Sequence, residues 1–278
     1  MAEITADMVK QLREATNVGM MECKKALMEA GGDAAKATKL LRERGIGVAA
    51  KRAMRSTNQG LLASAAADGG RIFSLVEVMC ETDFVARNEN FQAFVRKLAE
   101  AACRTDGNLA DETRDLVIAK IAEIGENIVV RRNLRYQLKD TGRLGAYVHL
   151  GGKVGVLIEV GAQKDGSLAD PRLAELVTDL TLHVTASAPR YLVPAEIPAD
   201  VIAAEREIYA KQVKDKPPQI VQKIVDGKMK KFHSEVCLLE QPFVKEPKQS
   251  VAALLAATAK ALEDGLTIRR FVRWQLGE

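Results

Sequence analysis

The segment VVRRNLRYQL (Val129–Leu138) returns near the end of the chain as TIRRFVRWQL (Thr267–Leu276). Both copies share the frame R-R-x-x-R-aromatic-Q-L, and apolar residues alternate with polar ones along each copy. Such alternation is typical of a half-buried β-strand. Because the two matching segments lie 138 residues apart, from Arg131 to Arg269, we predict an internal duplication.

Each copy of this strand is preceded by a predicted β-hairpin. The first hairpin has the turn DGG at residues 68–70 between two apolar segments, and the second has GG at residues 151–152. Two amphipathic helical segments follow in each copy, at residues 90–104 and 111–125 in the first and at 171–187 and 250–265 in the second. The repeated unit is therefore hairpin–helix–helix–strand.

The two copies differ in length. The hairpin turns are 82 residues apart, from Gly70 to Gly152, whereas the matched arginines are 138 apart. The second copy therefore holds 56 extra residues between its helices, roughly residues 189–247. The insert contains two helical segments, ADVIAAEREIYAKQVK and PQIVQKIVDGKMKKF, broken by DKPP, and we predict an antiparallel helical hairpin arm.

Residues 1–55 have the pattern of three short helices. Val9 and Leu12 share one face of the first, Cys23 and Leu27 recur at helical spacing in the second, and Asp33 can cap the third. This arrangement resembles ubiquitin-associated bundles, which usually bind a partner. After it, RGIGVAAKRAMRSTNQG is predicted to be a connector, because two glycines weaken any continuous helix.

The predicted fold class is α+β, with an N-terminal three-helix bundle of the ubiquitin-associated type, a duplicated core and an inserted antiparallel helical hairpin. The expected division is a helical partner-binding bundle (1–55), a first core subdomain (56–140), a second core subdomain (141–188 and 248–278), and the arm with its return segment (189–247).

Composition narrows the class of protein. The 278 residues carry a net charge of +4 and only 4% aromatic residues, which is weak provision for binding nucleic acid. No apolar run approaches the roughly 20 residues that span a bilayer, and MAEITADMVK lacks the pattern of a signal or transit peptide. We expect a cytoplasmic protein without membrane contact. The four scattered cysteines are expected to be buried thiols.

Catalytic motifs are not found in the sequence. It contains no phosphate loop, nucleophile elbow, H-E-x-x-H or dinucleotide fingerprint. His149, His183 and His233 show no metal-ligand spacing, and His183 lies on an apolar helix face, where a hydrogen-bonded core histidine is the favoured interpretation. We therefore expect no enzyme, no catalytic residue, no metal and no cofactor.

The segment CETDFVARNENF (80–91) contains an aromatic residue where a polar loop is expected. Phe84 and Val85 stand among polar residues between a buried strand and an amphipathic helix. Two interpretations are open. The ring of Phe84 either packs locally as a hydrophobic staple on Phe91 or Phe94, or it is exposed to contact a partner.

The paired arginine strands raise an RNA- or ribosome-binding alternative, since arginines with Tyr136 and Trp274 could present a sheet to RNA. We expect the aromatic residues on the buried face shared with Leu134 and Leu138, and the arginines on the opposite face. A sheet that reads RNA needs exposed aromatic residues, so this remains the alternative function.

Three separated motifs carry a resemblance to a known family. They are ITADMVKQLREATNVGMMECKKALMEAGGDAAKA (4–37), TDFVARN (82–88) and DGKMKKFHSEVCLLEQPFV (226–244). In this order they resemble the elongation factor Ts family over essentially the whole chain. The resemblance implies a guanine-nucleotide exchange factor that binds the GTPase elongation factor Tu and promotes GDP release during translation elongation, without covalent catalysis.

The resemblance also implies site residues. Thr82, Asp83, Phe84 and Val85 correspond to the family's loop that is inserted beside the magnesium and phosphate site of the GTPase. In this interpretation Phe84 acts as a wedge, and displacing the elements that hold Mg²⁺ weakens the retention of nucleotide.

Further contacts with the partner follow from the resemblance. Arg13, Met20 and Met21 match positions where the bundle docks on the GTP-binding domain, although Met20 also has core spacing. His149 matches a contact in the second core half, with an ordinary strand histidine as its alternative. Val244, in PFVKEP, is expected to reach another domain of the partner, although Lys245 replaces a commonly apolar residue. No direct nucleic-acid contact is expected, and homodimer formation is left open.

Overall fold

The computed structural model describes residues 4–16, 18–213 and 217–278. It combines helices with small β-sheets, which confirms the α+β class. The chain forms two compact units. The first unit comprises Met1–Ala63, Val76–Leu134 and Leu276–Glu278, and the second comprises Ser64–Leu75 and Arg135–Gln275.

Three helices form the N-terminal part of the first unit. They are α1 (Ala6–Thr16), α2 (Met20–Glu29) and α3 (Ala34–Arg52). Asp33 caps α3 by accepting a hydrogen bond from the backbone N–H of Lys36 at 3.0 Å. The small core between the helices is made of Val9, Leu12, Cys23, Ala26, Leu27, Ala37 and Leu41.

The predicted connector after this bundle is wrong over its first half, because α3 continues to Arg52. Gly45 and Gly47 lie inside the helix. A Cβ atom on Gly45 would stand 3.3 Å from the Cβ of Ala122 on α7 (Arg114–Ile124). The missing side chain lets α3 approach α7 closely, so tertiary packing outweighs the weak helix propensity of glycine.

The first sheet has the strand order β1-β2-β3. β1 (Gln59–Ala67) and β2 (Ile72–Cys80) are connected by the short helix η1 (Asp68–Gly70), and β3 (Ile128–Gln137) follows the helices of the first copy. Besides α7, these helices are α4 (Asp83–Arg87), α5 (Glu89–Ala102) and α6 (Leu109–Glu112).

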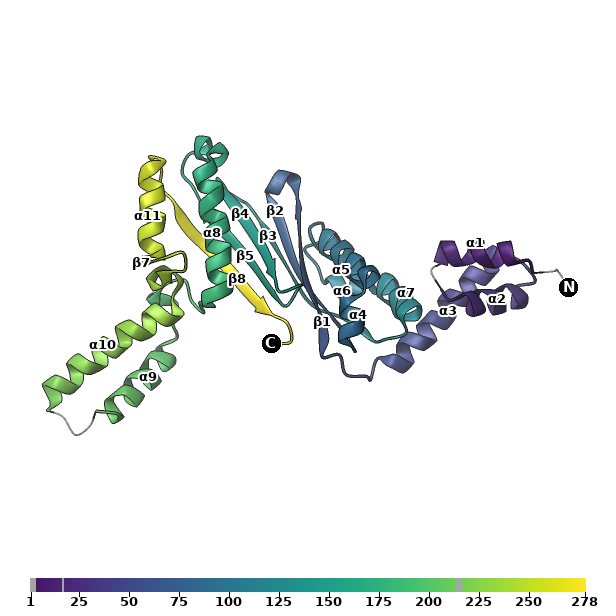
Figure 1. The fold of residues 1–278 in the computed structure, drawn as a ribbon, viewed down its shortest axis with the longest axis horizontal. Coiled ribbons are helices and arrows are strands. Elements are labelled where there is room, and N and C mark those ends of the chain that lie inside the picture. Colours follow the sequence, from purple (N-terminus) through teal and green to yellow (C-terminus); the bar gives the residue numbers. More distant parts are fainter. Residues whose placement is uncertain (1–3, 17, 214–216) are drawn as a thin grey trace. The chain divides into compact units, whose positions relative to one another are not determined.

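The second sheet has the equivalent order β4-β5-β8. β5 (Val154–Gly161) lies between β4 (Gly142–His149) and β8 (Thr267–Gln275), is antiparallel to both, and is buried along its whole length. Helices α8 (Pro171–Ser187) and α11 (Val251–Ala261) pack on this sheet (Figure 1). They bury apolar residues such as Leu173, Leu180 and Val251 against β5.

The two hairpin turns share an unusual conformation. Asp68, Gly69 and Gly70 have φ values of 51°, 59° and 87°, and Leu150, Gly151 and Gly152 have 50°, 61° and 93°. Three successive left-handed residues are strained for side chains larger than glycine, which is why each turn keeps two glycines. The duplication therefore extends to backbone conformation.

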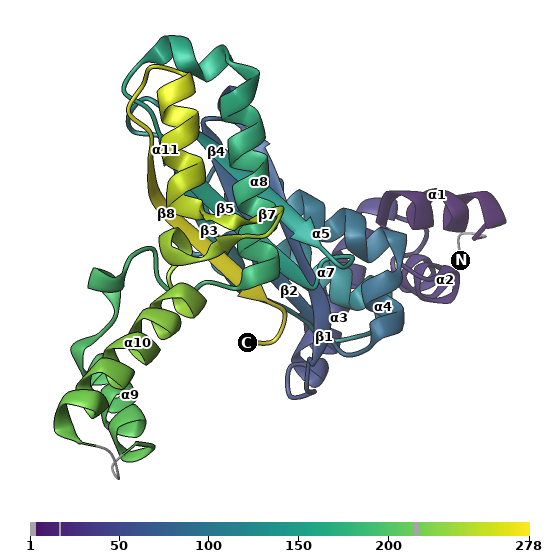
Figure 2. The ribbon, with the colours of Figure 1, turned by 60° about the vertical axis from the view of Figure 1, so that its left-hand side comes forward.

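Helices α9 (Ala199–Lys211) and α10 (Pro218–Val236) lie side by side (Figures 1 and 2). Val225, Met229 and Phe232 of α10 form a small apolar cluster with residues of α9 such as Ile202. Residues 214–216, which are the last residue of the first predicted helix and the first two of the predicted break, lie outside the described residues. The remaining short elements are η2 (Asp165–Ala169), η3 (Pro194–Glu196), η4 (Leu238–Glu240), β6 (Pro242–Phe243) and β7 (Glu246–Ser250).

A glutamate lies buried in the middle strand of each sheet and is held by two arginines. Glu77 of β2 accepts hydrogen bonds from Arg131, at 3.0 Å, and from Arg132. Glu159 of β5 accepts from Arg269 at 3.0 Å and from Arg270 at 2.7 Å. Each pair of arginines neutralises one carboxylate that would otherwise be costly to bury.

This arrangement corrects the expected position of the arginines. Arg131 and Arg132 are neighbours in the chain, yet both reach the same buried carboxylate. Tyr136 is buried as expected, and the guanidinium of Arg270 lies 4.0 Å from its ring centroid. Burial raises the pKa of Tyr136 to about 12. Four arginines of these two strands are therefore paired with the protein's own buried acids.

The four cysteines are buried free thiols, as predicted. No helix within the described part of the chain is long and apolar enough to cross a membrane.

Replacing Glu159 by glutamine is expected to lower the free energy of unfolding by roughly 1–3 kcal/mol, because two arginines lose a charged acceptor while remaining half-buried. Urea denaturation followed by circular dichroism measures the change. The control is Glu207→Gln on the exposed surface of α9, where Glu207 pairs with Lys211 and the loss should stay below about 0.5 kcal/mol. Equal losses in the two variants would contradict a stabilising role for the buried carboxylate.

Candidate functional site

The segment between β2 and α5 is a short helix, α4, and not the loop expected from sequence. Thr82 provides its N-cap, since the Thr82 hydroxyl oxygen accepts a hydrogen bond from the N–H of Val85 at 3.3 Å. Asp83 forms an ion pair with Arg87 one turn later, at 3.2 Å. The cap and the ion pair favour the helical conformation over an open loop.

Phe84 lies on this helix with 82% of its surface exposed. Phe91 is fully buried and Phe94 is 7% exposed, so both rings belong to the core while Phe84 does not. The hydrophobic staple is therefore not formed. Val85 is half-buried, and Ala86 is the residue of α4 that packs inward.

Glu126 anchors the base of α4. One carboxylate oxygen, Oε2, accepts hydrogen bonds from the backbone N–H groups of Glu81 and Thr82, both at 3.1 Å. The other oxygen, Oε1, accepts from the Thr82 hydroxyl at 2.6 Å. Three donors from the turn therefore converge on one side chain that stands between α7 and β3.

Glu81 makes the reciprocal contact. Its carboxylate accepts from the backbone N–H of Asn127 at 2.7 Å and pairs with Arg55 at 3.3 Å. The hydrogen bond from Asn127, followed by the contact with Arg55, holds the pKa of Glu81 below its usual range. The buried side chain of Asn127 donates to the carbonyl oxygen of Arg55 at 2.9 Å. The start of β3, the base of α4 and the segment that follows α3 are thus connected.

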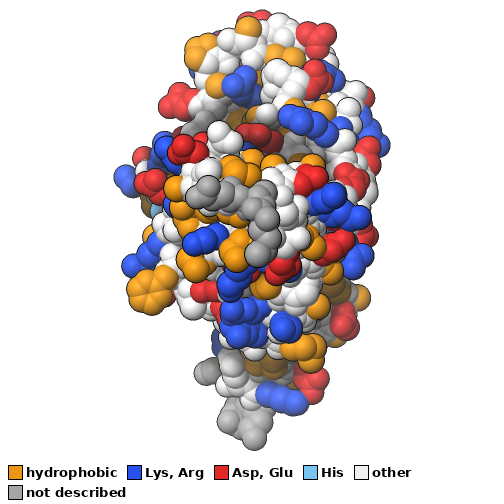
Figure 3. All heavy atoms as spheres, turned by 90° about the vertical axis from the view of Figure 1, so that its right-hand side faces the viewer, with side chains coloured by type: hydrophobic (Ala, Val, Ile, Leu, Met, Phe, Trp, Pro, Cys, Tyr) orange, Lys and Arg blue, Asp and Glu red, His pale blue; other side chains and the backbone are white. Residues whose placement is uncertain are grey.

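The bundle residues named from the resemblance are all exposed. Arg13 lies on the outer face of α1, and Met20 and Met21 begin α2 with 41% and 66% of their surfaces exposed. The core alternative for Met20 is therefore wrong. Figure 3 shows one face of the molecule, on which hydrophobic side chains are interspersed among charged ones.

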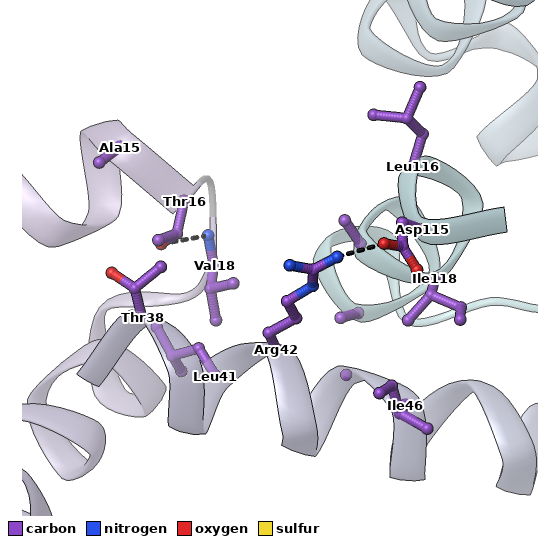
Figure 4. Close-up of a pocket in the computed structure, with 13 residues that line it drawn as sticks. Ala15, Thr16, Val18, Thr38, Leu41, Arg42, Ile46, Asp115, Leu116 and Ile118 are labelled. Atoms are coloured by element: carbon purple, nitrogen blue, oxygen red, sulfur yellow. Dashed lines mark hydrogen bonds and ion pairs between the residues drawn. The ribbon is translucent and has the colours of Figure 1, made fainter. Parts of the chain in front are cut away.

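A pocket of about 340 Å³ lies between the bundle and α7 (Figure 4). Arg42 of α3 reaches Asp115 of α7 across it, and Leu41, Ile46 and Ile118 supply apolar walls. None of the predicted site residues lines this pocket. The predicted site residues therefore lie outside this pocket.

The remaining two site residues lie in the second unit. His149 ends β4 and is half-buried, with its Nδ1 atom 3.0 Å from the hydroxyl oxygen of Tyr147. His149 therefore differs from an ordinary exposed strand histidine in its burial and in this contact. Val244 lies between β6 and β7 and is 44% exposed.

His183 holds the segment that carries Val244. The Val244 N–H donates to His183 Nδ1 at 3.2 Å, so the opposite ring nitrogen carries the proton and donates to Gln241 Oε1 at 2.9 Å. Burial lowers the pKa of His183. The expected core histidine is confirmed, and it has an additional role in positioning the exposed Val244.

The structure therefore brings Thr82, Asp83, Phe84 and Val85 together on one anchored helix. Sequence reasoning missed Glu81, Glu126 and Asn127, which hold that helix. The only signals of this anchor in the sequence are a glutamate directly after the predicted buried strand and another shortly before the predicted strand at 129–138. The contact between Glu81 and Glu126 joins positions 45 residues apart, and no sequence pattern predicts it. Within residues 4–16, 18–213 and 217–278, no group of three acidic, histidine or cysteine residues could hold a metal ion.

Comparison with known proteins identifies the family. The family model described as Elongation factor TS matches residues 81–278. The chain is 45% identical over 284 residues to elongation factor Ts of Symbiobacterium thermophilum, with 100% of this chain and 93% of that protein covered. It is 42% identical over 277 residues to elongation factor Ts of Nitratidesulfovibrio vulgaris, covering 99% and 96%.

The chain belongs to the elongation factor Ts family. A third relative, elongation factor Ts of Clostridioides difficile, is 42% identical over 291 residues, with 100% of this chain and 94% of that protein covered. Because these alignments span the bundle, both copies of the core and the inserted helices, membership applies to the chain as a whole. The family places it in protein biosynthesis, at the elongation step of translation.

Stability is expected to fall as the pH drops below about 6.5, because unfolded His183 binds a proton there while the folded protein resists it. Between about pH 7.5 and pH 5.5 the wild type should lose on the order of 1 kcal/mol more than His183→Gln, which lacks the titrating group. Urea denaturation at several pH values measures the difference. Parallel pH dependences of the two proteins would show that His183 titrates normally.

Proposed function

We propose that the chain is a guanine-nucleotide exchange factor that binds elongation factor Tu and promotes GDP release by displacing elements of its magnesium and phosphate site. It performs no covalent chemistry in this proposal. The observation that supports it best is Phe84, a large apolar ring that is 82% exposed on a helix held firmly at its base. An exposed aromatic residue on a rigid support is suited to insertion into a partner.

In this proposal Asp83 and Phe84 enter the GTPase, while Thr82 and Val85 set the shape of the helix that presents them. Burying a phenylalanine side chain contributes about 1.5–3 kcal/mol. The coupling is reciprocal, so nucleotide loses as much binding free energy as the exchange factor gains from the empty site. Each step of about 1.4 kcal/mol corresponds to a tenfold loss of GDP affinity.

The other parts of the chain would divide the remaining contacts. Residues 1–55, as a bundle of the ubiquitin-associated type, would dock on the GTP-binding domain through Arg13, Met20 and Met21. Methionine side chains suit such a surface because they adapt to the shape of a partner. The second core subdomain (141–188 and 248–278) would add His149, and the return segment of the arm (189–247) would add Val244.

Phe84→Ala is expected to slow GDP release roughly 10- to 100-fold at saturating concentration, because the wedge loses its apolar contact. Stopped-flow release of a fluorescent GDP from elongation factor Tu measures the rate, with circular dichroism to verify the fold. The matched control is Met54→Ala, which removes a side chain that is 94% exposed and lies outside the proposed contacts.

No acceleration of GDP release by the wild-type chain would refute the exchange function. Acceleration undiminished in Phe84→Ala would retain the function but move its cause to Asp83 or to the bundle. The RNA-binding alternative differs in its salt response, since complexes with phosphates weaken steeply with salt and an apolar contact changes much less.

Met21→Ala is expected to raise the concentration of exchange factor needed for half-maximal GDP release by roughly three- to tenfold, leaving the maximal rate unchanged. The reason is that the bundle contributes affinity for elongation factor Tu, whereas α4 displaces the elements of its magnesium and phosphate site. A titration of the same stopped-flow assay separates the two quantities. Met28→Ala is the matched control, since Met28 is exposed to 61% at the other end of α2. A reduced maximal rate in Met21→Ala would contradict this division of roles.

A further inference from the structure

We propose that Glu126 is a positioning residue for nucleotide exchange: it holds α4 in the orientation that keeps the ring of Phe84 exposed. This inference rests on the proposed function and extends it to a residue that does not itself contact the partner. Glu126 acts through three hydrogen bonds to the turn, from two backbone N–H groups and one hydroxyl group.

The need for such an anchor follows from the size of α4. A helix of five residues cannot be stable by itself, because nucleation fixes several backbone dihedrals before any hydrogen bond compensates for them. Only Ala86 of α4 is buried, so side-chain packing adds little. The orientation of this helix therefore depends on contacts at its base.

Thr82 connects Glu126 to the first turn of α4. Its hydroxyl group donates to Glu126 Oε1 at 2.6 Å, while its oxygen accepts from the N–H of Val85 at 3.3 Å. The same group thus connects the carboxylate to the first turn of the helix. Removing the carboxylate frees the hydroxyl to rotate and leaves the N–H groups of Glu81 and Thr82 without their acceptor.

The anchor also connects α4 to the segment that follows the bundle. Next to Glu126, Asn127 donates from its backbone to Glu81 at 2.7 Å and from its side chain to the carbonyl oxygen of Arg55 at 2.9 Å. Glu81 itself pairs with Arg55 at 3.3 Å. These contacts join the base of α4 and the segment that follows α3 to Asn127, the residue directly before β3.

The test combines exchange kinetics with a double-mutant cycle. Glu126→Ala is expected to lower the maximal rate of GDP release from elongation factor Tu roughly tenfold, the effect of losing charge-assisted hydrogen bonds. In the Phe84→Ala background the same change should alter the rate less than about twofold, since Glu126 acts through Phe84. Glu126→Gln keeps one oxygen acceptor and should restore most of the rate. The control is Glu100→Ala, an exposed glutamate of α5.

Equal losses from Glu126→Ala in both backgrounds would overturn the proposal, since they indicate general destabilisation. An unchanged maximal rate in Glu126→Ala would overturn it as well. Should circular dichroism show Glu126→Ala to be unfolded, Glu126→Asp takes its place, because it keeps the charge and shortens its reach.

Amide hydrogen exchange of the isolated chain separates this proposal from the exchange function. Glu126→Ala should accelerate amide exchange at Glu81, Thr82 and Val85 and leave β5 unchanged. If the wild-type chain fails to release GDP while these amides respond, the exchange function is wrong and the anchor is right. Unchanged hydrogen exchange at these three amides in Glu126→Ala would refute the anchoring role of Glu126, whatever the kinetics show.

Discussion

The buried carboxylate at the centre of each sheet is the constraint on which the two halves of the core depend. Glu77 and Glu159 occupy equivalent positions in the middle strands, and each is neutralised by two consecutive arginines of the last strand. Losing one arginine would remove one of the two charged donors that compensate for burying each carboxylate. The repeated R-R pair is therefore a structural requirement, and it sets the register in which Arg270 stands opposite Glu159.

At the candidate site, too, acidic side chains accept hydrogen bonds from segments that are distant in the sequence. There the donors are mainly backbone N–H groups, so Glu126 and Glu81 determine the path of the chain rather than the register of a strand. A large apolar side chain can remain exposed on such a turn because the turn does not depend on that side chain for its stability. Phe84 is thereby left available for a partner.

Exposure and rigidity are combined in a similar way near Val244. The Val244 backbone is bonded to His183, which is itself fixed by Gln241, while the Val244 side chain points out of the core. In both places a hydrogen-bonded polar side chain holds the backbone next to an exposed apolar residue. This is the arrangement expected of a protein that acts by contact, since a preorganised surface loses little conformational entropy on binding.

The sequence by itself determined the α+β class, the repeated strand, the hairpin turns and the buried thiols, because periodicity and glycine pairs are local signals. It also indicated Phe84 as unusual, without deciding whether the ring was buried. Only the tertiary structure decided that the ring is exposed, that Gly45 lies inside a helix, and that Glu126 and His183 accept hydrogen bonds from the backbone near the exposed residues. These outcomes depend on contacts between segments far apart in the chain, and hydrogen bonds of that kind follow no period that a sequence displays.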